Sequence, residues 1–165
     1  MGKVQKPLIA FCDYGEIRND EKVIDRKMLK IKRFMLFPLR FRPFQRSKWV
    51  RRRILSFGNP ICCPLVMFAR NHLPDTVFLG KFRSNGDWQA WERLSREKGS
   101  FVYMDKPLMY HRIHAESETS IIIGDNDRTK EDYEMFCMFW PKRIAKFLTR
   151  FYASSQKSND VSAKK

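Results

Sequence analysis

The chain has 165 residues, of which 43% are hydrophobic and 14 are phenylalanine, so it can bury the core of one globular domain. Lysine and arginine outnumber aspartate and glutamate by 33 to 18, and the net charge of +15 favours anionic partners such as phosphates, nucleic acid or an acidic membrane face. Four cysteines without paired CxxC spacing argue against a structural zinc site and against a secreted disulfide scaffold.

The chain is predicted to open in β structure. Residues 7–14 form a short apolar run rich in β formers, which is typical of a buried strand. Ile17-Arg18 and Val23-Ile24 flank Asn19-Asp20-Glu21, and this arrangement predicts a hairpin turn.

A basic aromatic arm is predicted over residues 26–53, which contain twelve lysines or arginines and no acidic residue. Short helical pieces are expected on either side of Pro38 and Pro43, since a proline disfavours helix in the residue before it. The pattern fits a solvated helix face, a nucleic-acid groove, or a surface that lies on anionic lipid, and the sequence does not separate these readings. The large aromatic residues of the arm are Phe34, Phe37, Phe41, Phe44 and Trp49.

The middle of the chain is predicted to contain strands around one helix. Residues 65–69 form an apolar run that predicts a central strand. After the turn signal Asn85-Gly86, apolar side chains from Trp88 onward fall at helical spacing until Gly99 stops the helix. Two further strands are predicted over residues 101–104 and 108–114.

Two helices and a tail are predicted at the C-terminal end. Residues 129–132 form a weak capping box for the first helix, and Pro141 fits the first position of the second. Residues 154–165 have one larger apolar side chain, Val161, and predict a disordered tail. Residues 1–153 are therefore expected to form a single domain.

Asp87 is the first candidate for chemistry. In the first turn of a helix its carboxylate lies near the positive end of the helix dipole, which favours the ionised form. A carboxylate held in this way can serve as a general base for a hydroxyl group. The alternative is a plain helix cap.

A second candidate group lies on one face of the strand predicted over residues 108–114. Tyr110, Arg112 and His114 share that face because side chains alternate along a strand. Arg112 offers a fork of donors for phosphate, and His114 offers a metal ligand or a proton-bearing contact. The alternative is an edge strand with solvated polar groups.

Three strings of the chain strongly resemble the C-terminal half of the family-2 glycosyltransferases, which are nucleotide-diphospho-sugar transferases. They are GNPICCPLVMF over residues 58–68, DWQAWERL over 87–94 and LMYHRIH over 108–114, with Phe82 before the second. The resemblance implies an α/β fold, the C-terminal part of a nucleotide-sugar transferase sandwich with a mixed sheet and flanking helices. The N-terminal nucleotide-binding half of that fold is expected to be missing here.

The resemblance also implies roles for five residues. Asp87 would be the acceptor base, Trp88 would line the acceptor site, and Asn59 would sit beside the acceptor pocket. Arg112 and His114 match the family's Arg-x-His, which is expected near the donor diphosphate and its divalent cation, Mn²⁺ or Mg²⁺. His114 is therefore a possible metal ligand, whereas the Asp-x-Asp that holds this metal in the family is absent.

The implied activity is an inverting transfer of a sugar from a nucleotide-sugar donor to a glycan or lipid-linked acceptor, as in cell-envelope glycan biosynthesis. A chain without the donor-binding half should have little activity alone, so an upstream donor-binding half is an expected partner. No apolar run reaches the roughly 18 to 20 residues of a membrane span. The expected location is therefore cytoplasmic, peripheral on the inner face of the cell membrane with the basic arm on anionic lipid.

Two other hypotheses stay open. One is a non-catalytic basic module that binds nucleic acid or anionic membrane through residues 26–53, with nucleic acid the less favoured of the two. The other is an inactive remnant that does not fold stably, because part of the parent sheet is absent and an edge is left unpaired.

Overall fold

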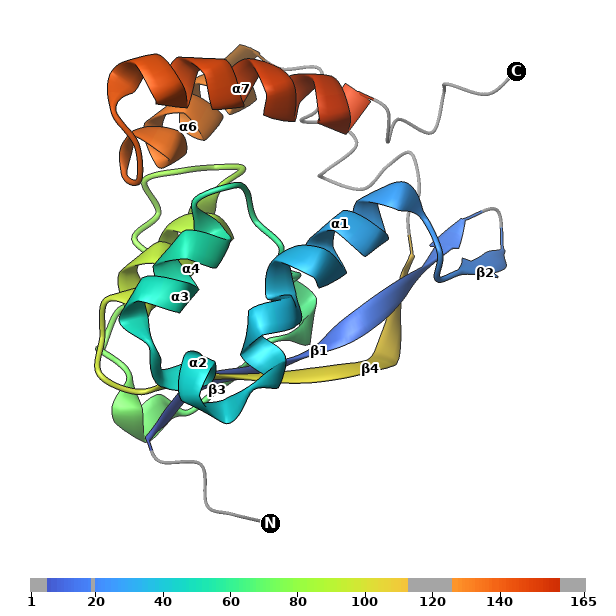
Figure 1. Cartoon of the computed structure of the whole chain (residues 1–165), viewed down its shortest axis with the longest axis vertical. Coiled ribbons are helices and arrows are strands. Elements are labelled where there is room, and N and C mark those ends of the chain that lie inside the picture. The colour runs from blue at the N-terminus through green and yellow to red at the C-terminus, as the bar shows by residue number, and fades with distance from the viewer. Residues whose placement is uncertain (1–5, 19, 113–125, 158–165) are drawn as a thin grey trace.

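The computed structural model describes residues 6–18, 20–112 and 126–157, and it contains an open sheet of four strands with flanking helices (Figure 1). The pairing of the strands is mixed, with one parallel pair and two antiparallel pairs. This confirms the expected α/β class with a mixed sheet. Among the described helices, none combines the length and the apolar content needed to cross a membrane.

The central strand is β1 (Pro7–Arg18), which extends the strand predicted over residues 7–14. On one side it pairs in parallel with β4 (Ser100–Arg112) along most of its length. On the other side it pairs antiparallel with β2 (Glu21–Val23) near its end and with β3 (Met67–Phe68) near its start. All other strands therefore depend on β1 for their backbone hydrogen bonds.

The predicted hairpin is confirmed, because Arg18 pairs with Glu21 across the turn and Asp20 adopts a positive φ of 63°. The prediction of a central strand over residues 65–69 is wrong. Pro64 lies in the first turn of the short helix η2 (Cys63–Leu65), and only the two residues of β3 remain to pair with β1.

The two strands predicted over residues 101–104 and 108–114 form one strand in the structure. β4 continues through residues 105–107, and its register against β1 shifts on either side of Asp13. The irregularity accommodates the extra residues of β4 opposite one residue of β1. Residues 113 and 114 lie outside the described residues.

The predicted arm folds into α1 (Lys27–Leu36), η1 (Phe37–Arg40), α2 (Arg42–Arg46) and α3 (Lys48–Leu55). Pro38 and Pro43 each lie in the first turn of their helix, as their lack of a backbone N–H allows. The inner faces of these helices contribute buried leucine and isoleucine side chains to the core. The segment is thus a layer of the fold and not a separate arm.

Of the twelve cations of residues 26–53, six form a hydrogen bond or an ion pair shorter than the 4.0 Å that separates Lys30 from Asp25. Arg33 donates to Asp13 at 2.5 Å, and Arg51 donates to the carbonyl groups of Glu97 and Gly99 at 2.8 Å. The others with such partners are Arg26 (Glu16), Lys32 (Tyr14), Arg40 (Asp105) and Arg52 (Glu92). Fewer positive charges remain for an external anion than the sequence suggests.

The core continues into α4 (Gly86–Ser95), α6 (Asn126–Cys137) and α7 (Lys142–Lys157). Trp88 of α4 contacts Phe136 of α6 edge to face and also the ring of Tyr152 of α7. Because Tyr152 anchors the end of α7, the helix runs on to Lys157. The prediction of a disordered tail from residue 154 is therefore wrong for residues 154–157, and residues 158–165 lie outside the described part.

A buried charge network joins α3 to α4. Glu92, whose side chain is 3% exposed, accepts from Arg52 and from Arg96, the latter at 2.7 Å. Arg52 also donates to the carbonyl of Met138 at 3.2 Å, just beyond α6. The carboxylate thereby joins α3 to α4, and Arg52 links both to the end of α6.

Removing this carboxylate should destabilise the chain. Glu92→Ala leaves Arg52 without its anion, and we expect the free energy of unfolding to fall by about 2–4 kcal/mol. Asp75→Ala, at a fully exposed carboxylate ahead of α4, is the control and should cost less than about 0.5 kcal/mol. Urea denaturation measures both, and equal losses in the two variants would contradict a structural role for the network.

Candidate functional site

Asp87 lies in the first turn of α4 and is partly exposed. Its Oδ1 accepts a hydrogen bond from the backbone N–H of Trp88 at 2.7 Å, and its Oδ2 accepts from Nδ2 of Asn59 at 2.8 Å. Asn59 is 28 residues away in the chain and lies in the loop after α3. The structure thus brings together two of the residues that the sequence had singled out.

The loop that leads into α4 is held by Glu131 of α6. Its carboxylate accepts three consecutive backbone N–H groups, those of Arg83, Ser84 and Asn85, at 2.8, 2.9 and 3.0 Å. These hydrogen bonds outweigh the effect of burial and hold the pKa of Glu131 below its ordinary value. The loop is therefore fixed by an ionised carboxylate at neutral pH.

The neighbouring residue Asp132 adds a second contact to the same loop, since its Oδ1 accepts from Nδ2 of Asn85 at 2.8 Å. The predicted capping box over residues 129–132 is wrong, because α6 already begins at Asn126. The acidic residues of that string hold the start of another helix, α4. No local pattern reveals this pairing, which spans 46 or more residues.

Burial raises the pKa of Asp87 above its ordinary value of 3.8. The hydrogen bonds from Trp88 and Asn59 and the positive charge of Lys32 act in the opposite direction but do not cancel it. The expectation that the helix start favours the ionised form is thus corrected, because desolvation outweighs the local donors. The result is a carboxylate of increased basicity.

Lys32 is a site residue that the sequence did not reveal, since it is one of twelve cations in its segment. Its Nζ donates to the phenol oxygen of Tyr14 at 3.0 Å. Burial lowers the pKa of Lys32, but the interactions with Tyr14 outweigh this and leave the pKa raised. Lys32 therefore stays positively charged near Asp87.

The adjacent Cys62 and Cys63 also border this site. Burial raises the pKa of Cys62 to about 11 and also raises that of Cys63. Both side chains are therefore neutral thiols at neutral pH, and neither has the thiolate character that a nucleophile needs.

Trp88 does not have the position expected for a residue that lines an acceptor site. Its side chain has no exposed surface, and its indole Nε1 donates to the carbonyl of Leu55 at 3.1 Å. A side chain buried in this way cannot touch an acceptor in this conformation. It anchors the start of α4 to the end of α3 and so fixes the position of the neighbouring Asp87.

Arg112 lies at the end of β4 and is exposed. It makes an ion pair with Asp20 at 2.8 Å, and no contact between Arg112 and Asp87 is seen. This position fits the alternative of a solvated edge strand. His114 lies outside the described residues, so its donor and metal contacts stay predictions, and among the described residues no group of three histidine, cysteine or acidic side chains could hold a metal ion.

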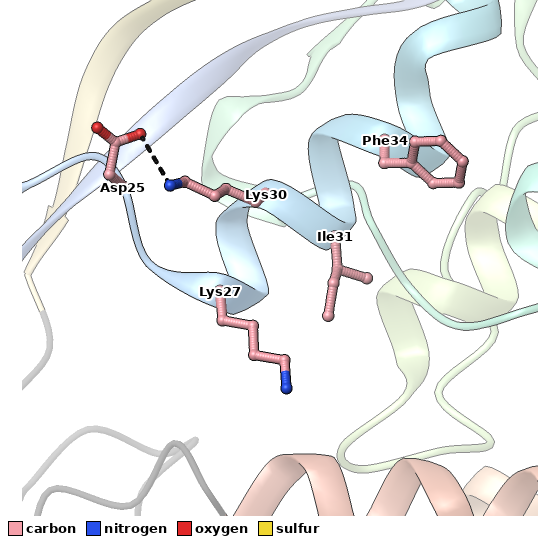
Figure 2. A pocket seen from close by; sticks show the side chains of 5 residues that line it. All are labelled: Asp25, Lys27, Lys30, Ile31 and Phe34. Atoms are coloured by element: carbon pink, nitrogen blue, oxygen red, sulfur yellow. Dashed lines mark ion pairs between the residues drawn. The ribbon is translucent and has the colours of Figure 1, made fainter.

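An open groove of about 440 Å³ runs along α1 (Figure 2). It is lined by the side chains of Asp25, Lys27, Lys30, Ile31 and Phe34, and Lys30 lies 4.0 Å from Asp25. These residues of α1 point outward, whereas Lys32 points inward toward Tyr14. The groove and the Asp87 site therefore lie on different sides of this helix.

Comparisons of the chain with protein-family models, with curated proteins and with solved structures found no match. The function must therefore be inferred from the residues and their geometry.

The Glu131 contact should make stability depend on pH. Because the pKa of Glu131 is lowered in the fold, its stabilisation is present above the ordinary value of 4.5 and is lost as the pH falls through the folded-state pKa. Glu131→Ala should reduce the free energy of unfolding by about 1–3 kcal/mol at neutral pH and by less in acid. The control is Glu134→Ala, an exposed residue of the same helix paired with Lys81. A loss that does not change with pH would contradict the role of the charge.

Asp87 should reduce stability at neutral pH. Because the pKa of Asp87 is raised in the fold, the folded chain favours the protonated carboxyl group. The free energy of unfolding therefore declines as the pH rises from 3.8 through the folded-state pKa. Asp87→Asn has nearly the same shape and should raise the free energy of unfolding by about 0.5–1.5 kcal/mol at pH 7. This gain should vanish at a pH well below 3.8, where Asp87 is protonated in the folded and in the unfolded chain. Urea denaturation of both proteins at pH 7 and in acid measures this gain. A less stable Asp87→Asn variant at pH 7 would contradict the prediction, because the hydrogen bonds to the carboxylate would then outweigh the effect of burial.

Proposed function

We propose that this chain is the acceptor-side part of an inverting glycosyltransferase, in which Asp87 is the base for the acceptor hydroxyl. The observation that carries the proposal is the partly exposed carboxyl group of Asp87, which has a raised pKa and is oriented by Asn59 and by the backbone of Trp88. The resemblance of residues 58–68, 87–94 and 108–114 to family-2 glycosyltransferases supports the same assignment.

The proposed reaction is a direct displacement. The acceptor hydroxyl oxygen attacks the anomeric carbon of the donor sugar while the bond from that carbon to the diphosphate oxygen breaks. The hydroxyl proton passes to a carboxylate oxygen of Asp87, and the nucleoside diphosphate leaves with the bonding electron pair. Each oxygen of Asp87 accepts one hydrogen bond in the structure, so each retains a lone pair for the acceptor.

Lys32 has a supporting role in this proposal. Burial alone would favour a neutral Asp87, which cannot accept a proton, and the positive charge of Lys32 lowers the pKa of this carboxyl group. Tyr14 fixes the ammonium group through its phenol oxygen. Lys32 therefore favours the ionised form of Asp87, whereas burial raises its basicity.

The donor side of the proposal rests on the resemblance. Arg112, and His114 outside the described residues, would contact the donor diphosphate, and a donor-binding half would supply the rest of that site. In the structure Arg112 forms an ion pair with Asp20. An exposed ion pair of this kind is worth about 0–1 kcal/mol, so a diphosphate could replace Asp20 at little cost.

The test is sugar transfer by the purified chain added to a cell-envelope extract that supplies acceptors and any donor-binding partner. UDP-, GDP- and TDP-sugars carrying a radiolabel are provided with Mn²⁺ or Mg²⁺. We expect incorporation that depends on the chain and that falls by about a hundredfold or more in Asp87→Asn. Asp75→Asn, at a fully exposed carboxylate, is the control and should transfer normally.

Two results would contradict the proposal. One is an incorporation that does not depend on added chain with any of these donors. The other is an Asp87→Asn variant that transfers sugar as fast as the Asp75→Asn control.

A further inference from the structure

The C-terminal helix α7 has an inner and an outer side. Ala145 and Thr149 are buried on the inner side, and Leu148 packs partly against the core. The outer side carries Ile144, Phe147 and Phe151, whose spacing of three and four residues aligns them in one stripe along the helix. α7 thus has an apolar surface in addition to the one that it uses to pack.

The stripe is unusually exposed for phenylalanine. Phe147 is 70% exposed and Phe151 is 71% exposed, and Ile144 is 43% exposed. Neither phenylalanine ring contacts another aromatic ring within the described part of the chain. Contiguous exposed apolar side chains of this size mark a surface for a partner.

Four positively charged residues lie on the exposed face of α7 between the apolar stripe and the buried side, and residues 142–157 include no acidic residue. Among residues 6–18, 20–112 and 126–157, none of the four has a hydrogen bond or an ion pair with a side chain. This distinguishes them from the cations of residues 26–53, of which more than half have a hydrogen bond or an ion pair in the fold. The four residues are Lys142, Arg143, Lys146 and Arg150.

We propose that the outer side of α7 binds the surface of a membrane that contains anionic lipid. Phe147 and Phe151 enter the boundary between headgroups and acyl chains, and the four cations contact lipid phosphates. A helix with lysine and arginine beside an exposed aromatic stripe has the chemistry of an interfacial helix. Figure 1 shows α7 at the outside of the molecule, where a flat surface can approach it.

Two other occupants fit the surface less well. A nucleic acid would neutralise the cations, but it would leave Ile144, Phe147 and Phe151 without an apolar environment. A second copy of the chain would cover the stripe, but it would bring two sets of unpaired positive charges together. Of these three occupants, the anionic lipid surface is the one that satisfies both features. This inference does not depend on the proposed sugar transfer.

The test is co-sedimentation of the full chain with vesicles. Vesicles of phosphatidylcholine and phosphatidylglycerol in equal parts are compared with vesicles of phosphatidylcholine alone. We expect binding to the anionic vesicles only, weakened in about 0.5 M salt by screening. The double variant F147S/F151S should lower the partition coefficient by about tenfold or more, because the two side chains no longer enter the lipid.

Two double variants serve as controls. M67S/L108S removes two similarly exposed apolar side chains from β3 and β4, which belong to the sheet and not to α7. F34S/F37S removes two exposed rings from the segment over residues 26–53. Both should bind anionic vesicles within about twofold of the unmodified chain if α7 is the binding surface.

The proposal is overturned if F147S/F151S binds anionic vesicles as well as the unmodified chain, or if F34S/F37S lowers binding more than F147S/F151S does. Equal binding of unmodified chain to neutral and anionic vesicles would also overturn it. If F147S/F151S leaves vesicle binding intact but weakens binding to polyuridylate, or changes a dimer to a monomer in sedimentation velocity, the surface belongs to nucleic acid or to a second copy.

Discussion

Three consecutive backbone N–H groups converge on the carboxylate of Glu131, and the position of the candidate site depends on this contact. Without it, residues 83–85 would present unpaired donors and α4 would have no fixed starting point. With it, Gly86 and Asp87 begin the helix at a set distance from Asn59, which comes from another loop. Because Glu131 belongs to α6 and α6 packs with α7 on the same core, the C-terminal helices are required for the geometry of the site. The two C-terminal helices, α6 and α7, thus support the position of Asp87.

At Asp87 two opposing effects decide the chemistry. The hydrogen bonds from Trp88 and Asn59 and the charge of Lys32 stabilise the carboxylate, whereas burial stabilises the protonated form. Burial has the larger effect, so the group is more basic than an exposed aspartate and the fold loses some stability at neutral pH. This is the arrangement expected of a proton acceptor, since a plain helix cap would gain stability from a fully ionised carboxylate. The buried Trp88 contributes through its backbone N–H, which donates to Oδ1 of Asp87, while its indole anchors the start of α4 to Leu55.

The sequence predicted the features that depend on local chemistry. The apolar run of β1 and the turn at Asp20 are present, and short helices lie around Pro38 and Pro43, although the residue before each proline is itself helical. The features that it missed depend on contacts between distant segments. Nothing near residue 131 indicates that its carboxylate holds residues 83–85, and Lys32 resembles the other cations around it until the fold turns it toward Tyr14. Trp88 was misjudged for the same reason, since an aromatic residue at helical spacing can face either a ligand or the core.

The pH titration of the Asp87 carboxyl carbon by NMR, in the full chain, tests the central claim most directly. Asp75, whose side chain is fully exposed, provides the internal reference in the same spectra. The account predicts a midpoint for Asp87 above that of Asp75 and a further rise in Lys32→Met, because this variant loses the charge that favours the carboxylate. A midpoint at or below that of Asp75 would contradict it, since Asp87 would then be an ordinary helix cap and not a base adjusted by burial.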